Sequence, residues 1–133
     1  MNAILVDTDV FSYTLKSDSR ARLYGQALQD RTLCLSFMTV AELRFWALNR
    51  RWGAERRRQL EAAMASCQIL QPDDRTGMIW AEISLHRSRL GRPISCSDCW
   101  IAASALRYGL PLVTHNAADY AGIPQLQVIS HGS

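Results

Sequence analysis

The sequence predicts an α/β fold in which a parallel sheet of four to five strands is covered by helices on both faces. Short apolar runs alternate along the chain with longer segments whose apolar residues recur at helical spacing. Parallel strands that are buried on both faces are apolar almost throughout, and a crossover helix connects each pair. The 133 residues are enough for one substantial core, so we expect a single domain over residues 1–133.

Five apolar runs are the expected strands. Each is short and rich in valine, isoleucine or leucine, as strands inside a covered sheet are. Pro72 closes the third run, because proline cannot donate to the ladder of a central strand. In chain order the runs are Ala3–Val6, Thr32–Ser36, Gln68–Leu70, Leu112–Thr114 and, at an edge of the sheet, Leu126–Ile129.

Six segments between these runs have helical spacing. Gly53 separates the third from the fourth, Gly91 and Pro93 end the fifth, and Gly109 and Pro111 stop the sixth. The segments are Val10–Leu15, Arg20–Gln29, Thr39–Leu48, Ala54–Ala65, Thr76–Leu90 and Ser97–Tyr108.

Composition is that of a globular protein in water. The chain is 48% hydrophobic and 20% charged, and none of its apolar runs approaches the length of about 18 residues that a membrane span requires. The N-terminus has no basic segment followed by a long apolar stretch, so we expect no secretory signal and a cytoplasmic location.

Arginine dominates the basic residues. The net charge is +3, and Lys16 is the only lysine among fifteen basic residues. Arginine binds phosphate and carboxylate oxygens bidentately. Six arginines fall in one stretch that holds only Glu42 and Glu55 as acids, which predicts either a solvated helical face or a patch that binds RNA or an acidic partner. They are Arg44, Arg50, Arg51, Arg56, Arg57 and Arg58.

Four tryptophans and four cysteines allow further interpretations. We expect Trp80 and Trp100 in the core, whereas Trp46 and Trp52 border the arginines and are candidates for contact with RNA bases or a partner. The motif Cys96-Ser97-Asp98-Cys99 has C-x-x-C spacing without the second ligand pair that structural zinc needs. All four cysteines are therefore expected to pack in a reducing compartment.

Four acidic residues are expected at one edge of the sheet, where parallel folds bind ligands. Asp7 follows the first strand, Glu42 lies in the first turn after the second, and Asp119 follows the fourth. Asp98 begins the helix that leads into the fourth strand, so its end of that helix lies at the same edge. Converging carboxylates repel one another unless a cation neutralises them, and ligation by oxygen alone suits Mg²⁺ or Mn²⁺ rather than zinc.

Helix capping is the competing explanation for three of these acids. Asp7 is different, because it directly follows core residues and Asp9 fits better as the cap of the next helix. Capping predicts acids at both edges of the sheet, so their convergence on one edge favours a metal site. The capping patterns are Thr39-x-x-Glu42, Ser95-x-x-Asp98 and Asn116-x-x-Asp119.

Taken together, four motifs in this order resemble the PIN-domain nucleases, and more narrowly the VapC-type toxins of bacterial toxin–antitoxin pairs. The motifs are Val6-Asp7-Thr8-Asp9-Val10, Ala41-Glu42-Leu43, Asp98-x-x-Ile101-Ala102-Ala103 and Leu112-Val113-Thr114-x-Asn116-x-x-Asp119-Tyr120. The resemblance implies an α/β/α sandwich, RNA cleavage that depends on Mg²⁺ or Mn²⁺, an antitoxin partner and a homodimer within a larger complex.

The resemblance also assigns roles to residues. It makes Asp7, Glu42, Asp98 and Asp119 the acids of the metal site, with Thr114 and Asn116 as supporting polar residues. We expect Asp7 and Asp98 to bind metal directly, and Glu42 and Asp119 to bind it directly or through water. Asp9 stands where the family often has asparagine or serine, which makes it a candidate outer-shell residue, and cysteines beside Asp98 are unusual.

Four other functions are alternatives. A phosphotransfer fold that uses Asp7 and Asp9 needs a lysine after a later strand, and Lys16 comes far too early. A metal-free ribonuclease needs catalytic histidines, but His115 has no evident partner and is expected to point away from its neighbours. A non-catalytic module that binds RNA or protein, and a housekeeping PIN-type nuclease, remain the alternatives.

Overall fold

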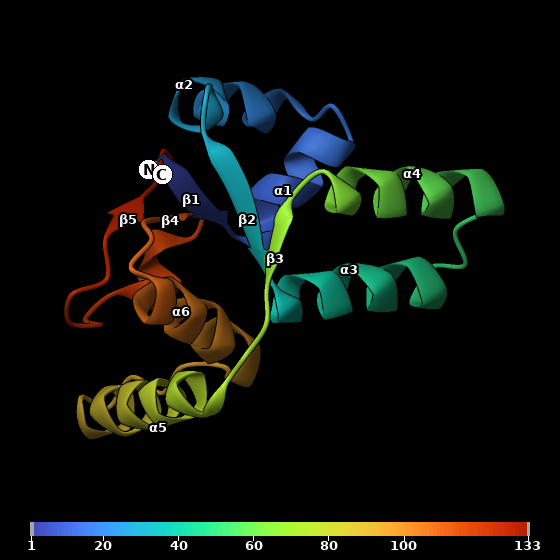
Figure 1. The fold of residues 1–133 in the computed structure, drawn as a ribbon. Helices are drawn as coiled ribbons and strands as arrows, with labels where there is room; N and C mark the ends of the chain where they lie inside the picture. The colour runs from blue at the N-terminus through green and yellow to red at the C-terminus, as the bar shows by residue number, and fades with distance from the viewer. Residues whose placement is uncertain (1, 133) are drawn as a thin grey trace.

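All five expected strands form one parallel sheet in the computed structural model, which describes residues 2–132 (Figure 1). The order across the sheet is β3-β2-β1-β4-β5, so the chain builds outward on one side of β1 and then crosses to the other side. The strands are β1 (Ala3–Val6), β2 (Thr32–Ser36), β3 (Gln68–Leu70), β4 (Leu112–Val113) and β5 (Val128–Ile129). Such a reversal opens a crevice beyond the carboxyl ends of the strands on either side of it, here β1 and its neighbours.

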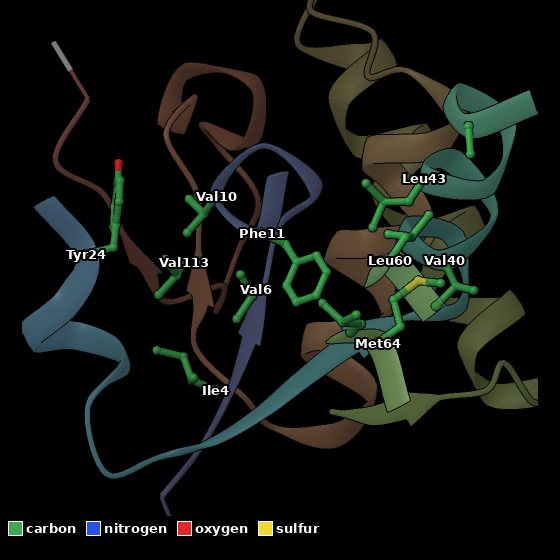
Figure 2. Packing of buried hydrophobic residues seen from close by; sticks show 12 residues of the cluster. Ile4, Val6, Val10, Phe11, Tyr24, Val40, Leu43, Leu60, Met64 and Val113 are labelled. Carbon is green, nitrogen blue, oxygen red and sulfur yellow. The ribbon is translucent and has the colours of Figure 1, made fainter. Parts of the chain in front are cut away.

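Helices cover both faces of this sheet, as predicted (Figure 1). Side chains alternate along β1, so that Ile4 and Val6 face one core and Leu5 faces the other. In Figure 2, Phe11 lies between the strand side chains and those of α3 and α4. The first face carries α1 (Thr8–Leu15), η1 (Ser19–Tyr24), α2 (Gly25–Leu28), α3 (Phe37–Asn49) and α4 (Ala54–Ala65). The second carries α5 (Asp74–Arg89) and α6 (Cys96–Tyr108), and η2 (Ala117–Tyr120) follows β4.

The first helix begins two residues earlier than predicted, and Asp9 is not its cap. Asp7 has the extended backbone of an N-cap residue, and its carboxylate accepts a hydrogen bond from the Thr8 backbone N–H. Strand β1 therefore passes into helix α1 with only Asp7 between them, which fixes the Asp7 carboxylate at the sheet edge. Asp9 becomes the second residue of the helix.

Two further helices differ from expectation. The predicted helix over Arg20–Gln29 is divided into the 3₁₀ segment η1 and the single turn α2, which meet at Gly25, a poor helix former. Helix α3 begins directly after β2, where Ser36 caps it by accepting from the Met38 backbone N–H. The expected cap at Thr39 was therefore wrong, because that residue already lies within the helix.

Among residues 2–132, no helix is both long enough and apolar enough to span a membrane.

Candidate active site

The carboxylate of Asp7 lies at the carboxyl end of β1 and is almost fully buried, with 6% of the residue exposed. Its Oδ1 accepts from the Thr8 backbone N–H at 2.7 Å. Its Oδ2 accepts from the Thr114 hydroxyl at 2.7 Å and from the Tyr120 hydroxyl at 3.0 Å. Burial raises the pKa of Asp7 to about 7, and the nearby Asp9 carboxylate adds to the rise. Within residues 2–132, no basic side chain forms an ion pair with this buried acid.

Tyr120 joins Asp7 to a second acid. The same phenol lies 3.2 Å from Asp98 Oδ1, at the start of α6. Asp98 is half-buried, and burial raises its pKa, with the Asp119 carboxylate adding to the rise. Ser95 caps α6 by accepting from the Asp98 backbone N–H at 3.2 Å, so that half of the expected capping pattern is present. The Asp98 carboxylate itself faces Tyr120.

Glu42 is held by Thr8, the residue that follows Asp7. Its Oε1 accepts from the Thr8 hydroxyl at 2.8 Å. The Thr8 hydroxyl also lies 2.9 Å from that of Thr39, which must be the donor because Thr8 has only one hydroxyl proton. Burial raises the pKa of Glu42, and the Asp98 carboxylate raises it further. Glu42 therefore belongs with Asp7, Asp98 and Asp119 to one set of neighbouring carboxylates, the acid group. The capping role predicted for Glu42 with Thr39 was wrong.

Asp119 lies at the exposed rim of this group, on η2. Its backbone carbonyl accepts from the guanidinium of the buried Arg87 at 2.8 Å, which fixes the segment in place. Its charge raises the pKa of Asp98, so the two carboxylates are close enough to repel each other. Asn116 makes no side-chain capping bond to η2, so the third predicted capping pattern was also wrong.

Asp9 and Asn116 fasten the loop after β4 rather than join the acid group. Asp9 Oδ2 accepts from the His115 backbone N–H at 3.0 Å and from Asn116 Nδ2 at 2.8 Å. The Asn116 backbone N–H in turn donates to the hydroxyl of Thr114 at 3.1 Å. The His115 ring lies 2.6 Å from the Tyr24 hydroxyl through its Nδ1 and contacts none of the acids.

The sequence comparisons agree with this arrangement. The family model described as the PIN domain matches residues 4–122. This chain belongs to the PIN domain family. It is 29% identical over 125 residues to the ribonuclease VapC1 of Haemophilus influenzae strain R2866, which spans 92% of this chain and 93% of that protein. The predicted family and its α/β/α fold are thereby confirmed.

Solved structures give the same result. The structure of VapBC-1 from nontypeable Haemophilus influenzae is 28% identical, with a TM-score of 0.82 over 96% of this chain and 97% of that one. VapBC-5 from Mycobacterium tuberculosis, described as a member of the VapBC family of toxin–antitoxin systems, is 29% identical, with a TM-score of 0.72 over 98% of this chain and 99% of that one.

The atoms in this PIN domain that could coordinate a metal ion are carboxylate oxygens. Asp7 Oδ1 accepts one hydrogen bond and keeps a free lone pair, and Asp98 Oδ2 has no hydrogen-bond partner within the described chain. None of the four acids takes part in an ion pair in residues 2–132. In that same range, no three His, Cys, Asp or Glu side chains are close enough to enclose one ion. This pattern fits Mg²⁺, which takes one or two carboxylates and completes its shell with water and phosphate oxygens.

The six arginines from Arg44 to Arg58 lie on α3, on α4 and in the turn between them. Arg44 pairs with Glu61 at 2.8 Å across the two helices, and Arg58 pairs with Glu55. Arg56 lies over the Trp52 ring at 3.8 Å. A groove of about 320 Å³ runs between the two helices. It is lined by Arg44, Ala47, Leu48, Arg57, Leu60 and Glu61. Ion pairs thus take up part of the predicted basic patch.

Two expectations about the core were wrong. Trp100 is only half-buried and packs against the rings of Trp80 and Phe37, each with a centroid 5.5 Å away, rather than against either core, whereas the half-buried Trp80 packs against the second core as predicted. Cys96 is exposed at the start of α6, whereas Cys99 is buried and its thiol lies 3.4 Å from the Trp80 carbonyl. All four cysteines are free.

Sequence analysis also missed three residues that organise the site. Thr8 and Tyr120 supply the hydroxyls that connect the acids, and the guanidinium of Arg87 anchors η2. Their positions gave some signal, since Thr8 lies between two aspartates and Tyr120 directly follows another. Arg87 gave none, because an arginine in the last turn of an exposed-looking helix is ordinarily solvated.

Proposed function

We propose that this chain is a metal-dependent endoribonuclease and the toxin of a toxin–antitoxin pair. The observation that carries the proposal is the pair of carboxylates, Asp7 and Asp98, held at the carboxyl edge of a PIN-domain sheet by one shared phenol. Like charges buried together cost stability, and neither acid forms an ion pair within residues 2–132, which supports binding of a cation or a basic group there during function. The names of the relatives, ribonuclease VapC1 and a toxin–antitoxin system, support the activity and the biological class.

The proposed reaction is hydrolysis of an RNA phosphodiester. Bound Mg²⁺ or Mn²⁺ supplies positive charge that orients the phosphate, activates water and stabilises the leaving oxygen. Asp7 and Asp98 are the direct ligands in this proposal, and Glu42 and Asp119 act directly or through water. Thr114 and Tyr120 hold the Asp7 carboxylate in one orientation, while Thr8 fixes that of Glu42. Asp9 and Asn116 keep the loop that carries Thr114 in place.

Cleavage of RNA by the purified protein tests this proposal. Activity should require Mg²⁺ or Mn²⁺, stop with a chelator, and leave 5′-phosphate and 3′-hydroxyl ends. Cleavage that resists the chelator and leaves 2′,3′-cyclic phosphates would instead support a histidine mechanism.

A cognate antitoxin and a cytoplasmic location complete the proposal, together with a homodimer inside the larger complex. A basic side chain of the antitoxin would neutralise the acid group and exclude the metal. The groove between α3 and α4 has apolar walls at Leu60, which is buried, and at Leu48, which is 67% exposed. That arrangement suits an amphipathic helix or an extended segment.

Co-expression tests the partner. A neighbouring gene that encodes the antitoxin should relieve growth arrest, and the isolated antitoxin should bind less tightly at high Mg²⁺ or Mn²⁺ if it competes with metal. A chain that cuts RNA when purified but is harmless when expressed alone would be a housekeeping PIN-type nuclease.

A further inference from the structure

The hydroxyl of Tyr120 occupies an unusual position between two acids. It lies 3.0 Å from Asp7 Oδ2 and 3.2 Å from Asp98 Oδ1, while only 2% of the residue is exposed. The two carboxylates come from distant parts of the chain, 113 and 22 residues away from Tyr120. No other hydroxyl within residues 2–132 contacts both of them. Tyr120 is thus the direct link between strand β1 and helix α6 at the acid edge.

The Tyr120 ring is itself held rigidly. It belongs to the core beneath α5 and α6, which fixes the direction in which the phenol points. The residue before it is anchored by the Arg87 guanidinium, which donates to the Asp119 carbonyl at 2.8 Å. Arg87 also donates through Nε to the Arg92 carbonyl at 2.7 Å, so two of its guanidinium nitrogens, Nε and Nη1, bind backbone carbonyls. The hydroxyl therefore acts from a fixed support.

The contacts of Tyr120 leave one oxygen of each acid available. When Tyr120 donates to Asp7, Oδ2 accepts two hydrogen bonds, from Thr114 and Tyr120, and the lone pair left for a cation is on Oδ1. Asp98 uses Oδ1 toward Tyr120 and leaves Oδ2 open. A phenol has one proton and can satisfy only one carboxylate at a time. Because that proton goes to Asp7 or to Asp98, the phenol orients the two acids alternately and leaves the negative charge of the pair uncompensated.

We propose that Tyr120 is a positioning residue that presents Asp7 and Asp98 to one divalent cation. The inference rests on the proposed function. Hydrogen bonds that orient metal-binding carboxylates typically contribute 10- to 100-fold to metal affinity. The ring of phenylalanine would fill the same space in the core, so the hydroxyl alone carries this effect.

Tyr120→Phe tests the inference, with Tyr24→Phe as the matched control. Tyr24 is also fully buried and its hydroxyl lies near His115 Nδ1, but it contacts neither acid. Calorimetric titration with Mn²⁺ should show affinity reduced about tenfold in Tyr120→Phe and unchanged in Tyr24→Phe. In RNA cleavage, Tyr120→Phe should need about tenfold more Mn²⁺ for half-maximal rate, and saturating metal should restore most of kcat.

Each other outcome counts against a specific claim. Equal Mn²⁺ affinity in wild type and Tyr120→Phe overturns the positioning role and leaves the nuclease proposal standing. Wild-type protein that neither binds Mn²⁺ nor cuts RNA overturns both. A lower kcat that saturating metal fails to restore shows that the hydroxyl contributes beyond metal binding and overturns the positioning role as stated.

Wild-type protein gives a second test if Tyr120→Phe does not fold. With ¹³C-labelled tyrosine, the ring resonances of Tyr120 should shift on Mg²⁺ addition with the same midpoint as the heat of binding, while those of Tyr24 stay unchanged. Unmoved Tyr120 resonances at saturating Mg²⁺ overturn the inference.

Discussion

The Thr8 hydroxyl donates a hydrogen bond to Glu42 Oε1 at 2.8 Å and so joins α1 to α3 directly behind Asp7. Thr8 also donates its backbone N–H to Asp7, which makes one residue the contact point for two of the acids. Thr8 therefore couples the capping of α1 by Asp7 to the position of the Glu42 side chain.

Thr8→Val should misplace Glu42 while keeping the size of the side chain. We expect the free energy of unfolding to fall by about 2 kcal/mol, because the hydrogen bonds to Glu42 and from the buried Thr39 are both lost, and the rate of RNA cleavage to fall as well. Urea unfolding and single-turnover cleavage measure the two effects. Thr8→Ser retains the hydroxyl and serves as the control. Equal cleavage rates in the two variants would show that Glu42 needs no fixed orientation.

Asp98→Asn and Ser95→Ala separate catalysis from helix capping. Ser95 supplies the cap of α6, and its hydroxyl also lowers the pKa of the Asp98 carboxyl through a hydrogen bond, so Ser95→Ala should cost about 1 kcal/mol of stability and reduce turnover far less than loss of the carboxylate does. Asp98→Asn keeps the cap and removes a metal ligand, so it should nearly abolish cleavage without unfolding the protein. Asp7→Asn should do the same. Thermal melts and cleavage assays on all three variants give the comparison, and substantial turnover in Asp98→Asn would contradict the assigned site.

The metal-free protein should become less stable as the pH rises from about 4 to about 7. The folded state holds a proton on Asp7 up to about pH 7, whereas the unfolded chain releases it near its ordinary value of 3.8. Across that interval the folded state binds more protons, so raising the pH favours unfolding. Burial raises the pKa of Asp98 and Glu42 as well, which adds to the same slope.

Urea unfolding in a chelator at several pH values measures this dependence. Asp7→Asn should flatten most of the slope, because asparagine does not titrate, and bound Mg²⁺ should flatten it in wild type by stabilising the ionised acids. A stability that rises over the same interval in the metal-free wild type would contradict the burial argument.

Reversal of Arg56, Arg57 and Arg58 to glutamate tests the basic stretch on α4. If these residues hold RNA, binding should weaken and its salt dependence should flatten, with each lost phosphate contact removing about 0.7 to 0.9 from the log–log slope. If they hold an acidic partner, cleavage should persist and inhibition by the antitoxin should fail. Filter binding against salt concentration and an inhibition assay distinguish these outcomes.

A control variant with the same change of charge reverses Arg22, Arg75 and Arg89, which are exposed elsewhere on the chain. Equal losses in both triple variants would show that only the overall charge matters. No loss in either assay would leave the α4 arginines as a solvated face.

The sequence by itself determined the strands, the order of the acids and their common edge. Ile4 and Val6 alternate with Leu5 in a run too apolar for anything but a covered strand, and a parallel sheet brings every carboxyl end to one edge. The position of Asp7 follows from that local pattern alone. Because these features depend on nearest neighbours and on periodicity, a single sequence carries them.

Tertiary structure decided which side chains touch. Asp7 rather than Asp9 caps α1, since the helix begins without an intervening loop. The Tyr120 hydroxyl contacts Asp7 and Asp98, which are 113 and 22 residues away in the sequence. Arg44 on α3 forms an ion pair with Glu61 on α4. Trp100 lies outside both cores although its helical spacing is apolar. Such contacts depend on how whole elements pack and which direction each side chain takes, and neither is encoded in the spacing of residues along one segment.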